Sequence, residues 1–266
     1  MNRTLPFFAA IAASVLALPA GAILIRADRD DEEYRELATR YPAAVGLGGM
    51  GAPESTGVII APRWILTAAH RAAALRAMKG PLRIAGRPHG IQEIFVHPDW
   101  KAGGDSDIAL VFLRESVAGV EPAPIYRGSG EAGEAARVVG LGGTGRIGER
   151  DSKRDGRPRA AINTIDRVTP RALGLRLKGR EDASDLQGAL APGDDGAPAF
   201  LEMDGRILVA GIASGTEDTN GDGIAGSVGD WEAYARVSAF ADWIDDVMSK
   251  AAVEEAARAT AKPPGR

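Results

Sequence analysis

The side chains of this 266-residue chain restrict the chemistry that it can perform. It has no cysteine, which excludes a disulfide framework, a Cys-ligated zinc site and a thiol nucleophile. Its three histidines are His70, His89 and His97, so imidazole chemistry has few possible positions. Acidic residues outnumber basic ones by 36 to 32, and a net charge of −4 gives no reason to expect a nucleic-acid partner.

The elements that must position these residues are predicted to be short β-strands. Short apolar runs alternate with glycine and proline, as at residues 58–60, 108–113 and 207–212. Many short runs with turn residues between them are typical of an all-β sandwich or barrel. From residue 238 onward, Phe240, Trp243 and other apolar residues fall at helical spacing, which predicts a helix over residues 238–261.

The N-terminus has the pattern of an export signal. Arg3 precedes an uncharged stretch, residues 4–25, which contains Ala-Gly-Ala at 20–22. This pattern predicts a signal peptide over residues 1–22, and cleavage after Ala22 is favoured over an uncleaved membrane anchor. Cleavage would make Ile23 the new N-terminus and leave a secreted or periplasmic protein. The charged stretch that follows, residues 26–36, is predicted to be a solvated surface segment.

Three segments match the motifs of one protease family, and they occur in the expected order. They are Leu-Thr-Ala-Ala-His at 66–70, Asp-Ile-Ala-Leu at 107–110 and Gly-Asp-Asp-Gly-Ala-Pro at 193–198. With these segments the chain resembles the trypsin/chymotrypsin family of serine proteases, and it is most similar to bacterial secreted members with few cysteines. The resemblance implies a trypsin-like double antiparallel β-barrel with a C-terminal α-helix. The first barrel would span residues 23–125, the second barrel residues 126–237 and the helix residues 238–261.

The resemblance also implies catalytic roles. His70 matches the catalytic histidine, Asp107 the carboxylate that orients it, and Asp195 stands where the family has its nucleophilic serine. Near neutral pH an aspartate has no proton to give, and it is a poor nucleophile toward an amide. It would also place a negative charge between the oxyanion-hole amides of Gly193 and Asp195. We therefore predict a proteolytically inactive homologue that binds a peptide or protein in the cleft between its barrels.

Two other readings of the same site remain open. In the first, the chain is an active hydrolase, either with residual serine-type peptidase activity or with Asp195 as the nucleophile of esterase- or dehalogenase-like chemistry. In the second, Asp195 and His70 hold a metal ion. Asp107 should occupy the other ring nitrogen, which leaves too few ligands, so no metal is expected there.

Further residues take their roles from the resemblance. Asp194 matches the aspartate that pairs with a freed N-terminal amine, here that of Ile23; the alternative is a simple turn carboxylate. Ala189, Ser214 and Thr216 are predicted to line the primary specificity pocket, and the uncharged Ala189 argues against a Lys/Arg preference. The segment 214–216 can pair with an extended peptide by strand addition.

The remaining candidates are weaker. Asp218, Asn220 and Asp222 resemble the first half of an EF-hand loop, but the twelfth position is Gly229, so a loop of Asx turns is favoured over a Ca²⁺ site. His89 and His97 are predicted to be surface or loop histidines. No other cofactor is expected. The partner would be a peptide or protein rather than nucleic acid or a membrane, and the chain is expected to be a monomer.

Overall fold

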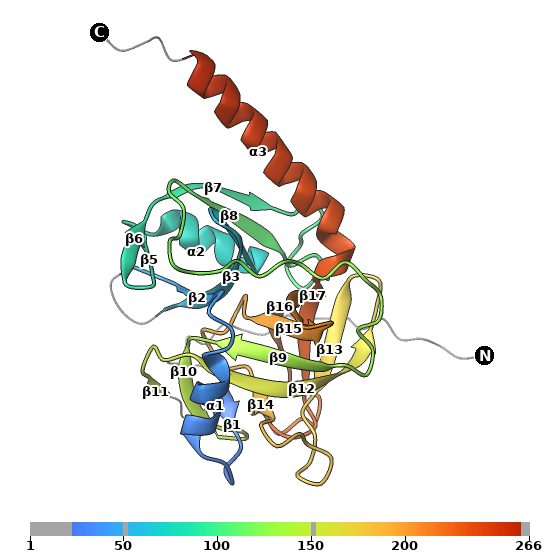
Figure 1. The fold of residues 1–266 in the computed structure, drawn as a ribbon. Helices are drawn as coiled ribbons and strands as arrows, with labels where there is room; N and C mark the ends of the chain where they lie inside the picture. The colour runs from blue at the N-terminus through green and yellow to red at the C-terminus, as the bar shows by residue number, and fades with distance from the viewer. Residues whose placement is uncertain (1–22, 50–52, 150–152, 262–266) are drawn as a thin grey trace, which may run out of the picture.

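Two groups of strands make up most of the chain in its computed structural model, which describes residues 23–49, 53–149 and 153–261 (Figure 1). The predicted signal peptide, residues 1–22, lies outside the described residues. The strands are β1 (Leu24–Ile25), β2 (Ala44–Leu47), β3 (Ser55–Ala61), β4 (Trp64–Thr67), β5 (Leu82–Ile84), β6 (Arg87–His89), β7 (Ile91–Val96), β8 (Ala109–Leu113), β9 (Ala135–Gly140), β10 (Gly143–Arg146), β11 (Lys153–Arg154), β12 (Arg159–Val168), β13 (Ala172–Arg176), β14 (Gly188–Ala189), β15 (Pro198–Met203), β16 (Arg206–Glu217) and β17 (Trp231–Arg236). The helices are α1 (Asp31–Ala38), α2 (Ala72–Ala77), α3 (Ala241–Ala261) and the 3₁₀ turns η1 (Ala69–Arg71) and η2 (Val237–Phe240).

The C-terminal half contains a closed antiparallel barrel in the order β12, β13, β17, β16, β15, β9. It closes because β9 pairs with both β12 and β15. Its interior is filled by apolar side chains from alternate strand positions, such as Ile165, Leu173 and Leu201. A small sheet beside the barrel, in the order β11, β10, β1, β14, includes the first described strand.

The N-terminal half forms a five-stranded antiparallel sheet in the order β2, β3, β4, β8, β7, with β5 and β6 as a separate hairpin. Together with the closed barrel and the C-terminal helix, this sheet confirms the predicted trypsin-like all-β fold. Residues 114–134, all of which the structure describes, connect β8 to β9 without a strand or helix, apart from an isolated bridge that joins Ile125 to Val209. This segment crosses from one half to the other (Figure 1).

One apolar core runs through both halves. Leu66 and Leu110 from the N-terminal sheet belong to the same buried cluster as Phe200 and Ile212 from the barrel. Phe240 of η2 joins this cluster, so the C-terminal segment covers the junction of the two halves. The shared core fixes the two halves relative to each other, and therefore fixes the residues that meet between them.

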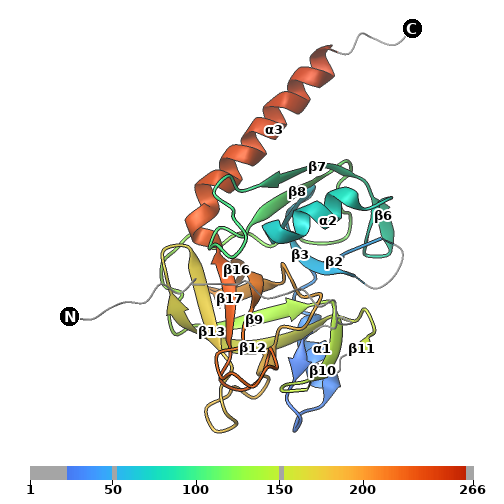
Figure 2. The ribbon, with the colours of Figure 1, turned by 180° about the vertical axis from the view of Figure 1, so that it is seen from behind.

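Helix α3 begins against the core, and its C-terminal end projects beyond both halves, as the two opposite views show (Figures 1 and 2). Ile244 and Ala251 are buried on its inner face, whereas Val253 is 70% exposed. An ion pair of 2.8 Å between Arg63 Nη1 and Glu255 Oε2 ties its later turns to the N-terminal sheet. No helix in the described part of the chain combines the length and apolar character needed to span a bilayer.

The charged segment 26–36 lies at the surface, as predicted, but it contains part of a helix and one buried side chain, that of Tyr34. Its residues 31–36 belong to helix α1, whose first turn is closed when the Asp30 N–H donates to Glu33 Oε2 at 3.1 Å. Helix α1 packs on the barrel through Tyr34, which is fully buried, while its acidic residues face outward. Asp31 in addition accepts hydrogen bonds from the buried Arg159 of β12.

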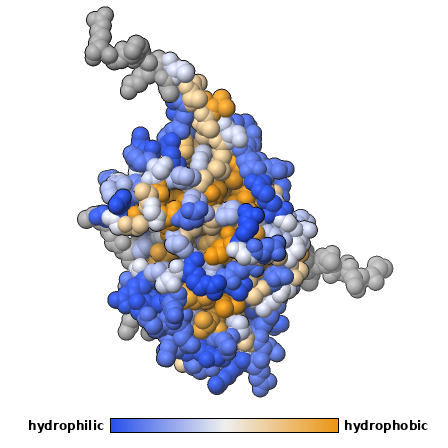
Figure 3. Space-filling view, in the orientation of Figure 1, coloured by the Kyte–Doolittle hydropathy of each residue, from blue (hydrophilic) through white to orange (hydrophobic). Residues whose placement is uncertain are grey.

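Apolar side chains also reach the surface between the two halves, in the central band of Figure 3. Two hollows of about 430 and 370 Å³ flank the connecting segment there, and Pro124 and Arg206 line both. Ile125 and Ile207 are only partly buried at this surface.

Candidate active site

Paired strands bring His70 and Asp107 together. His70 lies in η1, directly after β4, and Asp107 lies two residues before β8. Because β4 and β8 are neighbours with Thr67 opposite Ala109, the end of one strand adjoins the start of the other. Residues far apart in the sequence therefore meet at one edge of the N-terminal sheet.

His70 and Asp107 make a two-point contact. The ring Nδ1 lies 2.7 Å from Asp107 Oδ2, and the His70 backbone N–H donates to Oδ1 at 2.8 Å. The Ser214 hydroxyl also donates to Oδ2 at 2.5 Å. Burial alone would raise the pKa of Asp107, but the contacts from His70 and Ser214 outweigh it and hold the pKa below its ordinary value. Asp107 is therefore an ionised acceptor that keeps a proton on His70 Nδ1.

The backbone of β16 explains the position of Ser214. The register with β17 shifts between Ala213 and Gly215, which leaves Ser214 as an extra residue in a β-bulge. A bulge redirects the side chain that it carries, and here the hydroxyl reaches Asp107 in the opposite half of the molecule.

Asp195 lies on the other side of the His70 ring. Its Oδ1 is 3.4 Å from His70 Nε2, and its Oδ2 is 3.9 Å from Arg71 Nη1. Burial lowers the pKa of His70, but hydrogen bonds and charge interactions with Asp107 and Asp195 outweigh burial and raise it to about 9. At neutral pH the ring is therefore an imidazolium between two carboxylates.

We expect Asp195→Asn to lower the pKa of His70 from its value of about 9, because one of the two carboxylates loses its charge. An NMR titration of the ring protons measures this change, with Asp218→Asn as a control that removes a carboxylate from the exposed loop. Since the folded pKa lies above the ordinary 6.5, the ion pairs stabilise the fold fully below pH 6.5 and lose this effect as the pH rises through about 9. The free energy of unfolding should fall over that interval, and less so in Asp195→Asn. An unchanged His70 pKa in this variant would contradict the assignment.

The turn that carries Asp195 depends on two glycines with positive φ. Gly193 has φ +103°, and its carbonyl accepts a hydrogen bond from Thr56 Oγ1 at 3.2 Å. At Gly196 a Cβ would lie 2.2 Å from Thr67 Oγ1, so no side chain fits there. Among the described residues, no acceptor takes the N–H groups of Gly193 and Asp195. Both amides are thus available to a ligand.

Asp194 points into the protein and is fully buried. Its carboxylate oxygens accept hydrogen bonds from the N–H groups of Ala191 at 3.0 Å and Gly142 at 3.2 Å. Burial raises its pKa well above the ordinary value, and no ion pair to it occurs among the described residues. Gly140 leaves the necessary space, since a Cβ there would lie 2.1 Å from Asp194 Oδ1.

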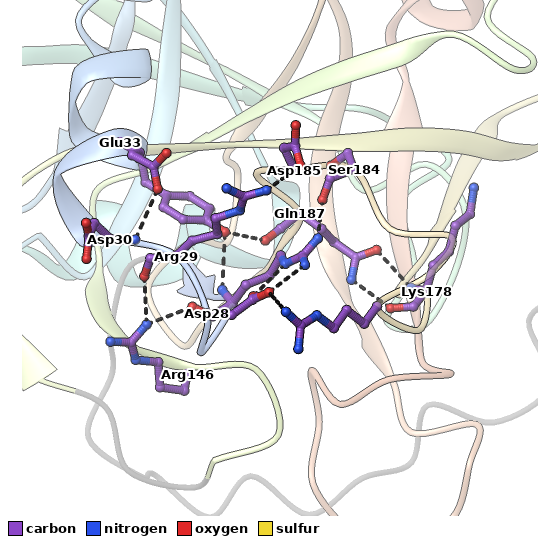
Figure 4. A network of polar contacts seen from close by, with 12 residues as sticks. Asp28, Arg29, Asp30, Glu33, Arg146, Lys178, Ser184, Asp185 and Gln187 are labelled. Atoms are coloured by element: carbon purple, nitrogen blue, oxygen red, sulfur yellow. Dashed lines mark hydrogen bonds and ion pairs between the residues drawn. The ribbon is translucent and has the colours of Figure 1, made fainter.

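Residues 23–25, the first that the structure describes, are buried beside β10 and β14. Ile23 is 1% exposed, and Leu24 of β1 lies between Gly145 of β10 and Ala189 of β14. The chain that follows is held by the polar network of Figure 4. In it, Arg146 Nη1 donates to the carbonyls of Arg26 at 2.7 Å and Arg29 at 3.1 Å.

The structure also places the predicted pocket residues. Ala189, in β14, is fully buried; Thr216, in β16, is partly exposed. One buried acid in this region is not indicated by any motif: Glu232 of β17, whose pKa burial raises to about 7. The available signal was its spacing of two from the inward-facing Tyr234, which puts both side chains on the same face of the strand.

The acidic loop after β16 caps its own backbone. Asp218 accepts hydrogen bonds from the N–H groups of Gly221 and Gly223, each at 2.8 Å, and Asp222 accepts one from Ile224 at 2.7 Å. This is the pattern of Asx turns. Within the described ranges, no group of three or more His, Cys, Asp or Glu side chains is arranged to hold a metal.

The other two histidines are buried. His97 lies in the loop after β7, in keeping with its prediction as a surface or loop residue, whereas His89 is the last residue of β6, so for it this prediction was wrong. His89 is 6% and His97 is 9% exposed. The ring of His97 packs edge-on against Phe240 and Trp243, each at a centroid distance of 5.0 Å, and so serves the attachment of the C-terminal segment.

The structure has a closed β-barrel beside a second β-sheet, and a hydrogen-bonded histidine and aspartate lie where the two meet. This arrangement is the one found in two-lobed serine proteases. The chain belongs to the Trypsin family, whose family model matches residues 31–244.

Comparisons with individual proteins agree with this family assignment. Serine protease 56 of Mus musculus is 32% identical over 230 residues, which cover 79% of this chain and 37% of the mouse protein. A protein of Corynebacterium glutamicum named as a peptidase is 27% identical over 202 residues, 73% of this chain and 64% of its own length. The chain therefore spans less than two thirds of each of these relatives. The structure of neuropsin, a serine protease of mouse brain, superposes with a TM-score of 0.61 at 18% identity and covers 79% of this chain and 96% of neuropsin, which supports the fold.

Proposed function

We propose that this protein is an exported trypsin-family homologue that binds peptides or proteins in the cleft between its two halves and has no peptidase activity. The observation that carries the proposal is the position of Asp195 Oδ1, 3.4 Å from His70 Nε2, where the family has the hydroxyl of its nucleophile. A general base must accept a proton at this nitrogen. In this site the nitrogen is protonated instead and faces a carboxylate.

The chemistry of acyl transfer is blocked at three points. His70, with its pKa raised to about 9, is already protonated at neutral pH and cannot take a proton from a nucleophile. The Asp195 carboxylate has no proton to give, and its attack on an amide would form a high-energy anhydride. Its negative charge also lies on the same turn as the Gly193 and Asp195 amides and opposes the oxyanion that they would stabilise.

The parts of the site that bind a peptide backbone are retained. β16 pairs with β15 only as far as Ile212, so residues 214–216 have a strand edge without a partner strand in the described chain. A Cβ built on Gly215 would meet nothing within 4 Å, which leaves the backbone open to an extended ligand. Together with the Gly193 and Asp195 amides, this edge supports binding by strand addition.

Two measurements on the wild-type protein test the proposal. We expect no covalent labelling by a fluorophosphonate, and we expect binding of an extended peptide selected from a random library. A copy of that peptide with N-methylated amides is the matched control, because it keeps the side chains but lacks the donors needed for strand addition. Covalent labelling, or equal binding of the methylated copy, would contradict the proposal.

Export remains part of the proposal. The pattern over residues 1–22 supports it, as does the burial of Ile23 directly before β1, which pairs with β14. Asp194 is buried without a cation among the described residues, and a freed Ile23 amine would provide one.

A further inference from the structure

The segment between Glu54 and Glu93 is strongly basic. It contains six Arg or Lys residues and no Asp or Glu, in a chain whose net charge is −4. Two of the six, Arg63 and Arg71, have a carboxylate partner. The other four are exposed, and within the described ranges no carboxylate lies at ion-pair distance from them; they are Arg76, Lys79, Arg83 and Arg87. Their charges are therefore available to an anionic ligand.

A hollow of about 720 Å³ lies among these cations, between α2 and β7 (Figure 1). Two arginines line it: Arg76 of α2, and Arg114, the residue after β8, which is also exposed and has no carboxylate partner among the described residues. The β5–β6 hairpin, which carries two of the other cations, begins and ends at the same hollow. Four apolar side chains also line it, those of Leu75, Met78, Ile91 and Ile94. The hollow therefore combines an apolar lining with a cationic rim.

Contacts with the backbone hold both lining arginines in place. Arg76 Nη2 donates to the Ile94 carbonyl at 2.9 Å. The Arg114 N–H donates to the Gly90 carbonyl at 2.8 Å, and its side chain packs on Gly90, where a Cβ would lie 2.8 Å from Arg114 Cδ. Glu93 also lines the hollow, but in the described chain it forms an ion pair with neither arginine. Side chains that are already ordered lose less conformational entropy when they bind a ligand.

We propose that this basic surface, formed by Arg76, Lys79, Arg83, Arg87 and Arg114, binds an acidic segment of a partner protein that inserts an apolar side chain into the hollow. The unpaired cations are complementary in charge to glutamate and aspartate, and a guanidinium group binds a carboxylate through paired hydrogen bonds. The surface is separate from the cleft, because no residue of the candidate active site lines the hollow. It is therefore a second binding site, and its occupancy does not depend on the proposed function.

The lining of the hollow favours a protein segment over other polyanions. Single-stranded nucleic acids bind largely by stacking their bases on aromatic side chains, and no aromatic side chain lines this hollow. Surfaces that bind anionic membranes also present exposed apolar side chains, and the large exposed ones of the described chain, Val228 and Val253, lie elsewhere. An acidic peptide supplies both the carboxylates and the apolar side chain that this surface accommodates.

Three N-acetylated heptapeptide amides test the inference. The first has three glutamates on each side of a leucine, the second has glycine in place of the leucine, and the third has glutamines in place of the glutamates. Binding is followed by NMR shifts of the amides of Gly80 and Gly90, which line the hollow, and of residues 214–216 in the cleft. We expect the glutamate–leucine peptide to shift the first group and not the second, and to bind wild type roughly tenfold or more tightly than either analogue.

Variants of the protein locate the effect. Arg76→Gln combined with Arg114→Gln should weaken binding of the glutamate–leucine peptide roughly tenfold or more. The matched control is Lys101→Gln combined with Arg206→Gln, which removes two exposed cations elsewhere and should leave the affinity nearly unchanged. Equal weakening in this control would overturn the inference, because only the net charge would then matter.

Two further results would contradict the proposed surface. One is equal affinity of wild type for the glutamate–leucine peptide and either analogue, or shifts confined to residues 214–216. The other is binding of phosphatidylglycerol vesicles or of an oligothymidylate without binding of the glutamate–leucine peptide, which would assign the surface to another polyanion. The comparison of peptides on the wild-type protein decides the matter even where the double variant does not fold.

Discussion

Asp195→Ser should convert this protein into a peptidase, with a rate at least about a thousandfold above that of the wild type on a peptide substrate. The substitution supplies a hydroxyl proton and removes the charge that faces His70 Nε2 at 3.4 Å. With only Asp107 left beside it, His70 has a lower pKa and Nε2 becomes available as the base. The Ser214–Asp107–His70 contacts and the two amides of the turn are already in place.

The controls separate the hydroxyl from the loss of charge. Asp195→Ala removes the same carboxylate without adding a nucleophile, and it should stay inactive. Asp195→Ser combined with His70→Ala should also be inactive, because no base remains. The substrate should carry an uncharged residue at the cleavage position, because the uncharged Ala189 argues against a Lys/Arg preference. A folded Asp195→Ser protein that neither cleaves peptides nor reacts with a fluorophosphonate would contradict the prediction and show that more than the nucleophile has been lost.

Some features of this site could be predicted from the sequence and others could not, because they depend on different kinds of information. The meeting of His70 with Asp107 was predicted from the family motifs that carry them. The apolar runs indicate strands before His70 and after Asp107, but not that β4 and β8 pair, which the structure shows. The bulge that directs Ser214 to Asp107 depends on a register shift of one residue, which no periodic pattern reveals. The position of Asp195 could be predicted, but its distance to the ring could not.

The two buried side chains that the sequence did not reveal, Tyr34 and Glu232, share a physical cause. The acidic residues of 26–36 suggested a solvated segment, yet one aromatic residue, Tyr34, decides the position of α1 because its ring is buried in the barrel. Glu232 is also polar but fully buried, and its three donors come from β12, β17 and the segment after β14. Burial of a charged or polar side chain depends on partners distant in sequence, so composition alone predicts the opposite.

The second large effect is expected when Asp194 is substituted. In the Asp195→Ser protein, we expect Asp194→Asn to lower kcat/KM by roughly a hundredfold, since loss of one partner of a buried ion pair costs about 3 kcal/mol. The partner would be the amine of Ile23, freed by cleavage after Ala22. The amide of asparagine keeps the size of Asp194 and one acceptor oxygen, so the effect reports the missing charge.

Two further variants test whether the effect of Asp194 depends on the amine of Ile23. An Asp195→Ser protein that retains Ala22 has no amine at Ile23 and should show the same loss as Asp194→Asn. Asp246→Asn removes a carboxylate on α3 that is 54% exposed and should leave activity unchanged. Mass spectrometry of the exported protein should find Ile23 as its first residue. A different first residue, or full activity with Ala22 retained, would contradict the pairing. Asp194 would then be a carboxyl group of the turn, held by the Ala191 and Gly142 amides and kept protonated by its burial.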